Sequence, residues 1–376
     1  MSNSSRDHRF CRRVITTLLL ISVVAVLSGC HTVIFYSQAV KGQYQLITTR
    51  ESVKKLLADS TTQPRLRERL ELVQELRRFA EKQLKLPVDG HYQDYVDLRR
   101  DYVVWNVEAT PEFSMESRTW WYPILGRLDY RGYFSEKSAR KYGEWLRAQG
   151  YEVYYGGAAA YSTLGWFRDP VLSTFLFESK TDVAETIFHE LGHQVAFASG
   201  DTDFNEAFAT TVGQEGARRW VQSLNDSALL TAYQIALQRN SEFVGIVMKA
   251  RLQLESLYGD TRTTGGKIRA NSEPFVADPG YMREEKRRII EALRREYEAL
   301  KESWGGDADY DGWFEQPINN AKLNSVAAYY DLVPGFERLL EANNGDLEKF
   351  YGEVKLLAAA PREQRHQRLR YLAEIE

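Results

Sequence analysis

The sequence predicts an α+β fold that is predominantly helical, with a small β-sheet over one helix that carries a polar face. Three observations lead to this expectation. Apolar residues recur at helical spacing before residue 90, and the chain again has a helical pattern from about residue 204 onward. Between residues 100 and 175 the pattern changes to short β-prone segments. The segment that links the two regions, residues 182–199, is predicted to be a half-buried helix.

The N-terminal segment has the pattern of a lipoprotein signal peptide. Two Arg residues precede a short apolar segment, residues 14–27, and Leu-Ser-Gly stands before Cys30. We therefore expect residues 1–29 to be removed, Cys30 to be lipidated, and the protein to be anchored through this lipid in the periplasm. His31 follows the cysteine, which resembles lipoproteins sorted to the outer membrane. A retained N-terminal anchor helix is the alternative.

The cysteine content limits the ligands that a metal site can use, and the net charge limits the class of partner. The chain has two Cys, of which Cys11 lies in the predicted signal and Cys30 is the predicted lipid site. The processed chain would then have no thiol in an oxidising compartment, so a metal site must use His and carboxylate ligands. The net charge is −3 and no basic cluster stands out, which predicts no nucleic-acid partner.

Residues 30–90 are predicted to form a helical hairpin beside a larger domain that spans residues 91–376. A polar helical segment covers residues 37–59, and a second helix covers residues 63–84. Apolar residues recur at helical spacing in the second helix, and a Pro and a Gly follow its end.

The segment from residue 100 to residue 175 supplies the sheet. Residues 102–107 are β-prone, and residues 152–155 follow a capped helix over residues 135–150. Residues 156–162, Gly-Gly-Ala-Ala-Ala-Tyr-Ser, are a candidate edge strand, because small side chains let a peptide backbone approach and pair with it. An ordinary glycine-rich loop is the alternative.

Residues 189–193 read His-Glu-Leu-Gly-His, the spacing at which two imidazoles hold one zinc ion. A helix places residues i and i+4 on one face, so His189 and His193 can reach a single Zn²⁺. Glu190 lies about 100° further round the helix, beside the position of a zinc-bound water, where it can act as the general base. A core helix with two satisfied His and an exposed Glu is the alternative.

The helix that carries this motif is predicted to span residues 182–199. Ser179, Thr181 and Asp182 offer N-terminal caps. Gly200 is well suited to the position that follows a helix end, because glycine adopts the left-handed backbone conformation without strain.

A catalytic zinc needs a third protein ligand and an open fourth position. The metzincin continuation is absent, since Ala196 and Ser199 stand where it requires Gly and His. Glu206 opens a second helix that can fold back and present its first turn to the metal, so we favour it as the third ligand. Asp203 is the alternative, although Asp201 and Asp203 also suit the capping of that helix.

The motif is followed by residues 205–209, Asn-Glu-Ala-Phe-Ala, and together these resemble the gluzincin pattern, whose aminopeptidase branch carries H-E-x-x-H and then N-E-x-F-A. The chain more closely resembles a family of Gram-negative lipoproteins described as putative aminopeptidases. The similarity runs from Cys30 through residues 36–39 and the zinc motif to residues 319–321, and so covers nearly the whole chain. It implies a zincin-like metallopeptidase fold that binds zinc and hydrolyses peptides.

Gluzincins commonly use a Tyr or His to hydrogen-bond the oxyanion that develops during hydrolysis. The only His that follows the motif is His366, near the C-terminus, so a Tyr is the expected donor. The helix that opens at residues 319–321 ends with two tyrosines. We predict that Tyr329 is the donor and keep Tyr330 as the alternative, while packing remains the default role of any single Tyr.

Residues 307–312 mimic the start of a calcium loop with three alternating Asp and a Gly. The twelfth position of such a loop needs a bidentate Glu, and Ile318 stands there. We expect an acidic turn before Trp313. The preceding charged helix, residues 281–303, is expected to present a solvated face.

Two classes of function remain open from the sequence. The intact Glu190 favours an enzyme over a non-catalytic scaffold lipoprotein, because a purely structural zinc site has no use for a base. An aminopeptidase must also pair the α-ammonium of its substrate with an acid. Residues 156–162 contain none, and nothing in the sequence places Glu185 or Glu215 at the metal. The family resemblance therefore favours an aminopeptidase, and an endopeptidase with the same chemistry is the alternative.

Overall fold

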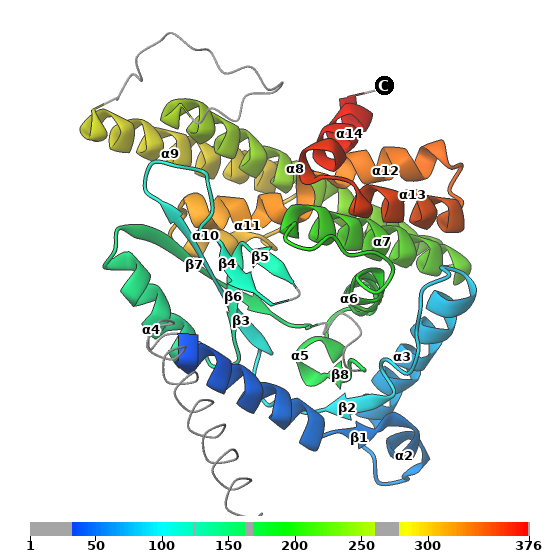
Figure 1. Ribbon diagram of the computed structural model, residues 1–376. Coiled ribbons are helices and arrows are strands. Elements are labelled where there is room, and N and C mark those ends of the chain that lie inside the picture. The colour runs from blue at the N-terminus through cyan, green and yellow to red at the C-terminus, as the bar shows by residue number, and fades with distance from the viewer. Residues whose placement is uncertain (1–31, 124, 162–167, 260–277, 375–376) are drawn as a thin grey trace, which may run out of the picture.

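The computed structural model describes residues 32–123, 125–161, 168–259 and 278–374 (Figure 1). The predicted signal segment, residues 1–29, and the predicted lipid site Cys30 lie outside the described residues. The described chain is mostly helical with small sheets, which confirms the α+β, predominantly helical prediction. Within it, no helix combines the length and the apolar character needed to cross a membrane.

The N-terminal region differs from the prediction in the extent of its first helix. Residues 32–48 are helical, and then β1 (Glu51–Ser52), α2 (Val53–Ala58) and α3 (Pro64–Lys82) follow. The single helix predicted over residues 37–59 is therefore wrong. β1 pairs antiparallel with β2 (Asp94–Val96), so tertiary pairing interrupts the helix. The second predicted helix is confirmed as α3, and the division of the chain at residue 90 stays a prediction.

A three-stranded sheet forms beside the helices. Its central strand is β3 (Val104–Pro111), which runs antiparallel to β6 (Tyr130–Tyr133) on one side and to β7 (Tyr151–Ala158) on the other. In the described chain β7 pairs with β3 alone and is an edge strand; residues 156–158 of the predicted edge segment belong to it, while Ser162 lies outside the description. α4 (Glu136–Arg147) covers one face, and its cap Ser135 confirms the predicted helix start.

Two smaller sheets complete the strands. β4 (Trp120–Tyr122) pairs with β5 (Gly126–Leu128), and β2 pairs in parallel with β8 (Val171–Leu172). The helices after β8 are α5 (Ser173–Leu176), α6 (Lys180–Gly192), α7 (Thr202–Ser223), α8 (Ser227–Tyr258), α9 (Pro279–Ser303), α10 (Asp311–Glu315), α11 (Asn320–Tyr330), α12 (Val333–Ala342), α13 (Leu347–Ala359) and α14 (Arg362–Glu374).

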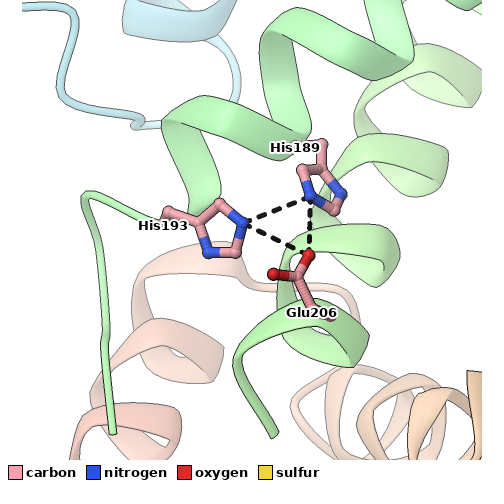
Figure 2. Close-up of side chains that lie close together, drawn as sticks. All are labelled: His189, His193 and Glu206. Carbon is pink, nitrogen blue, oxygen red and sulfur yellow. Dashed lines mark hydrogen bonds and ion pairs between the residues drawn. The ribbon is translucent and has the colours of Figure 1, made fainter. Parts of the chain in front are cut away.

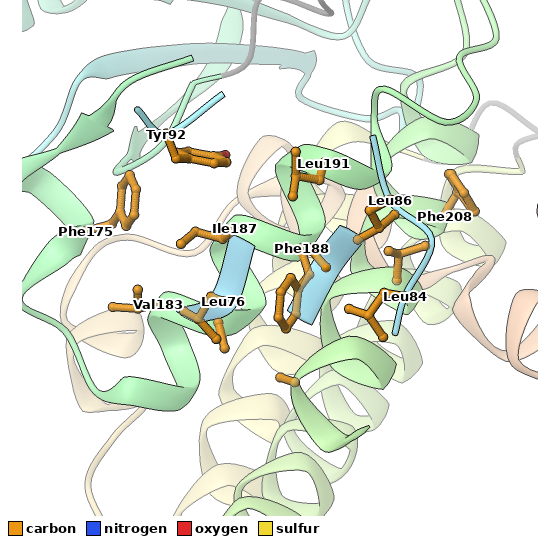
Figure 3. Close-up of a cluster of buried hydrophobic side chains, with 14 of the residues drawn as sticks. Leu76, Leu84, Leu86, Tyr92, Phe175, Val183, Ile187, Phe188, Leu191 and Phe208 are labelled. Carbon is orange, nitrogen blue, oxygen red and sulfur yellow. The ribbon is translucent and has the colours of Figure 1, made fainter. Parts of the chain in front are cut away.

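The largest cluster of buried hydrophobic side chains surrounds α6 (Figure 3). Val183, Ile187 and Leu191 repeat along one face of α6 at helical spacing and are at most 1% exposed. They pack with Leu76 from α3 and Phe208 from α7, so that α6 is held between these two helices. The polar residues of α6 therefore lie on its other faces.

α11 connects the helical region with the sheet, because it packs against α7, α8, β3 and β7. A second hydrophobic cluster lies between α8, α9 and α10, where Tyr297 stacks on Phe314 with ring centroids 4.2 Å apart. The predicted acidic turn precedes Trp313. Its carboxylates bond to the chain's own groups: Asp307 pairs with Arg239, and Asp311 accepts hydrogen bonds from Tyr297 and Lys301.

Candidate metal centre

The helix that carries His189 and His193 is shorter than predicted. Its cap is Ser179, whose Oγ accepts the Asp182 N–H at 3.1 Å, and this confirms one of the three candidate caps. The helix ends at Gly192 with His193 as C-cap, so the predicted end near residue 199 is wrong. Gly200 instead belongs to the connection to α7, where its φ is +75° and its N–H donates to the Leu125 carbonyl.

The connection between α6 and α7 is fixed by the first turns of α7. The side-chain amide of Asn205 accepts the Ala198 N–H at 2.8 Å and donates to the Ala198 carbonyl at 2.9 Å. The backbone at Ala198 therefore bonds to α7 and does not continue α6. Asp201 caps α7 by accepting a hydrogen bond from the Phe204 N–H. It is one of the two residues that the sequence offered as caps of this helix.

Glycines allow α6 and α7 to approach closely. A Cβ built on Gly213 of α7 would lie 2.9 Å from the Glu185 carbonyl oxygen and 3.2 Å from the Cβ of His189. A Cβ built on Gly192 of α6 would lie 3.3 Å from the Cα of Ala209. Larger side chains at these positions would separate the two helices, so the sequence itself permits the short distance between the metal-motif helix and Glu206.

The side chains of His189, His193 and Glu206 converge on one point (Figure 2). The two Nε2 atoms of the imidazoles lie 3.2 Å apart. The Oε2 atom of Glu206 lies 3.3 Å from Nε2 of His189 and 3.6 Å from Nε2 of His193. Ligand atoms about 2.0–2.1 Å from a tetrahedral zinc ion lie roughly 3.3–3.4 Å from one another. The three residues therefore fit a tetrahedral ion with one position left open.

Burial and charge set the protonation of these groups. Burial lowers the pKa of the His189 imidazole, which favours the neutral form that binds metals. Burial alone would raise the pKa of Glu206, but the neighbouring His193 and the hydrogen bonds of both imidazoles lower it, so this carboxylate stays ionised. Burial raises the pKa of Glu190 to about 8. A carboxyl whose pKa lies near neutrality is suited to accept and return a proton.

The structure brings Tyr329 to this group. Its ring lies nearly parallel to that of His189, with centroids 6.1 Å apart and 24° between the planes. The charge of Glu206 and burial hold its pKa well above the usual range, so its hydroxyl remains a hydrogen-bond donor. Burial raises the pKa of the alternative, Tyr330, and the other groups that affect it are Asn240 and Glu185, not the three converging residues.

The other acidic candidates are engaged elsewhere. Asp203, the alternative third ligand, accepts a hydrogen bond from Arg362 of α14 at 3.0 Å. Glu185 accepts a hydrogen bond from the Tyr233 hydroxyl at 2.5 Å. Glu215 forms ion pairs with Arg218 and Arg219 at 2.7 and 2.6 Å. None of these three carboxylates belongs to the group formed by His189, His193 and Glu206.

Two residues that the sequence analysis did not select, Glu108 and Tyr130, lie near Tyr329. Glu108 of β3 is paired in register with Tyr130 of β6 and Tyr154 of β7. The pKa of Tyr329 is raised by Glu206 first and further by Tyr130 and Glu108, which shows that these groups are electrostatic neighbours. Burial, followed by the charge of Asp129, raises the pKa of Glu108 well above its usual range. The alternation of side chains along β3 could have placed Glu108, because Val107 and Ala109 are buried against α4 and Glu108 lies on the opposite face of the sheet.

The C-terminal helix α14 secures the start of α7. Asp201 is 1% exposed, and its carboxylate lies 3.0 Å from Nη1 of Arg365 and 2.9 Å from Nε2 of His366. Arg362 reaches the same carboxylate at 3.5 Å. Asp201, Asp203 and His366 also lie close enough together to hold an ion, but the two arginines already neutralise these carboxylates.

The structure thus defines a mostly helical α+β protein with one buried His–His–carboxylate group in its described part. Its sequence matches the family model described as "Putative aminopeptidase" over residues 34–369, and the chain belongs to this family. The resemblance noted from the sequence is confirmed at this level. No curated protein and no solved structure matches the chain significantly. Membership of the family supports a peptidase enzyme that acts on peptide substrates.

Proposed function

We propose that this protein is a zinc-dependent aminopeptidase with a zincin-like fold. The observation that carries the proposal is the convergence of three ligand atoms, one from each of His189, His193 and Glu206, at separations of 3.2 to 3.6 Å. These residues would hold Zn²⁺, which supplies Lewis acidity toward the scissile carbonyl and the attacking water when it is bound. A structural zinc normally has four protein ligands, and this group has three.

The residues around the ligands have defined roles in this proposal. Glu190 takes the proton of the attacking water and passes it to the leaving amine, a task that suits a carboxyl group buried beside the ligands. Tyr329 keeps its proton and donates a hydrogen bond to the developing oxyanion. β7 offers an edge at which the substrate backbone can add as a further strand.

Glu108 supports the aminopeptidase over the endopeptidase. A free α-ammonium that leaves water needs a paired anion. Glu108 is a half-buried carboxyl near Tyr329 with no ion pair to any described residue, and a cation bound beside it would lower its raised pKa and ionise it. Gly156 of the neighbouring strand lies beside it, since a Cβ there would lie 3.9 Å from Oε1 of Glu108 and 3.4 Å from the Tyr154 ring. We assign Glu108 the recognition of the substrate amino terminus.

Metal analysis and kinetics of matched variants test the chemistry. Wild-type protein should contain one zinc per chain, and hydrolysis of a peptide should stop with a chelator and return with zinc. Glu190→Gln should keep the zinc and lose about 10²–10⁴-fold in kcat, because only the proton carrier is removed. His193→Ala should lose the zinc itself. Wild-type protein without zinc would overturn the proposal, and a zinc protein without activity on a broad peptide library would favour the scaffold.

A blocked substrate separates the two modes of cleavage. A free peptide should be cleaved at its first bond, and the same peptide with an acetylated amino terminus should not. Glu108→Gln should weaken kcat/KM for the free peptide by about 10–100-fold, the usual loss of a hydrogen bond to a charged group. Equal cleavage of both peptides at an internal bond would establish the endopeptidase.

We also infer that the protein is a lipoprotein held through Cys30 at the outer membrane, facing the periplasm. The sequence before Cys30 supports this assignment. Cys30→Ala should abolish lipid labelling and signal processing. A Cys30→Ala protein that still fractionates with membranes would indicate an uncleaved helical anchor instead.

A further inference from the structure

The helix over residues 32–48 carries apolar side chains on two opposite faces. One face is buried: Phe35 is 6% exposed and its ring lies 5.4 Å from that of Tyr133, while Leu46 is 2% exposed. Gln38 fixes this face to the sheet by accepting the Phe134 N–H at 2.8 Å. The helix is therefore attached to the folded protein through one side only.

The opposite face carries a stripe of exposed apolar side chains. Its members are Val33 (49% exposed), Tyr36 (42%), Val40 (70%), Tyr44 (67%) and Ile47 (42%). At about 100° per residue these five positions fall within an arc of roughly 80°. Of the large hydrophobic side chains that are exposed in the described chain, more lie on this helix than on any other element. A concentration of this kind marks an interaction surface.

We propose that this stripe (Val33, Tyr36, Val40, Tyr44 and Ile47) lies in the interface of a phospholipid bilayer. The proposal rests on the lipid anchor inferred at Cys30. Only two residues lie between Cys30 and Val33, so the two are at most about 10–11 Å apart. Acyl chains on Cys30 would therefore place the start of the helix among the lipid headgroups, with the stripe as the nearest apolar surface.

The composition of the stripe fits this location. It contains no charged residue, and tyrosine is favoured at the boundary between headgroups and acyl chains. A helix with one apolar face lies in the plane of the interface with that face buried by about 5–10 Å. Burial of this face would add apolar contact area to the attachment that the acyl chains on Cys30 supply. Because Gln38 ties the helix to the sheet, this contact also fixes how the protein is oriented on the membrane.

Site-specific thiol labelling of the intact lipoprotein tests the proposal. A processed chain has no thiol besides the lipidated Cys30, so an introduced Cys reports on one position. Val40→Cys probes the stripe, and Leu356→Cys on α13 is the matched control, since Leu356 is 74% exposed and Val40 is 70% exposed. Both proteins are reconstituted into vesicles of phosphatidylethanolamine and phosphatidylglycerol and treated with a water-soluble maleimide.

In vesicles the Cys at position 40 should react at least about tenfold more slowly than in the same chain made without its signal segment and lipid and kept in vesicle-free buffer, because the interface excludes the reagent, while the Cys at position 356 should react equally in both. Equal reactivity of the two positions in vesicles would overturn the proposal. Protection of position 40 in a soluble dimer would assign the stripe to a second copy of the chain. Mass analysis of the N-terminus reports separately on the lipid at Cys30, and peptidase assays report separately on the metal centre.

Discussion

Replacing Gly213 by Ala adds one methyl group where α7 crosses α6. The new Cβ would lie 2.9 Å from the Glu185 carbonyl oxygen and 3.2 Å from the Cβ of His189, and neither atom can move without moving α6. Overpacking of this kind costs about 1–3 kcal/mol. The gain in helix propensity from Gly to Ala returns about 1 kcal/mol. The variant should therefore lose up to about 2 kcal/mol of unfolding free energy.

Gly245 provides the matched control, because it also lies inside a helix, α8, and a Cβ built on it meets nothing within 4 Å. Gly245→Ala should be neutral or more stable by up to about 1 kcal/mol. Urea unfolding of the zinc-free proteins measures both values. Since α7 carries Glu206, displacement of α7 should also weaken zinc binding by about 10–100-fold in Gly213→Ala alone. If Gly213→Ala were as stable as Gly245→Ala, the close contact between the helices would not limit the fold.

Two further perturbations act on buried charges. Asp201→Asn leaves Arg365, whose side chain is 9% exposed, without its carboxylate, and should lower the unfolding free energy in urea by about 3–5 kcal/mol. The control Arg362→Ala removes a side chain that is 45% exposed and should cost at most about 1 kcal/mol. A loss below about 1 kcal/mol for Asp201→Asn would contradict this expectation. Burial raises the pKa of Glu185 from 4.5 to about 7, so between these values the folded chain holds a proton that the unfolded chain has lost, and stability falls as pH rises through this window. Glu185→Gln can keep the hydrogen bond to Tyr233 but cannot ionise. Its unfolding free energy should equal that of wild type at about pH 4 and exceed it by at most about 3 kcal/mol at about pH 8, as measured by thermal unfolding. A difference that does not change with pH would refute the assignment.

The candidate metal centre was largely predictable because its information is local. The spacing of His189 and His193 fixes their common face through helix geometry alone. Glu206 follows one short connection later, in the first turns of the next helix, so few alternatives competed with it.

The features that the sequence did not reveal depend on distant contacts. The predicted helix does not reach residue 199, and Asn205 instead binds the backbone of Ala198, a contact that periodicity does not encode. β1 interrupts a helical pattern because its partner β2 lies about 40 residues further along the chain. Glu108 was missed because β3 extends beyond residue 107, and only the observed register places its carboxylate near Tyr329.

The attachment of α14 to Asp201 has a consequence for the order in which the protein assembles. Arg365 and Asp201 are separated by 164 positions in the chain, and α14 is the last helix. Contacts between such distant residues form slowly, because a long loop must close before the contact can stabilise it. The last contacts at the start of α7, near Glu206, therefore form after the C-terminal residues have been synthesised and have docked. A chain that lacks α14 would keep His189, His193 and Glu206, and it should hold the proposed zinc more weakly than the full chain.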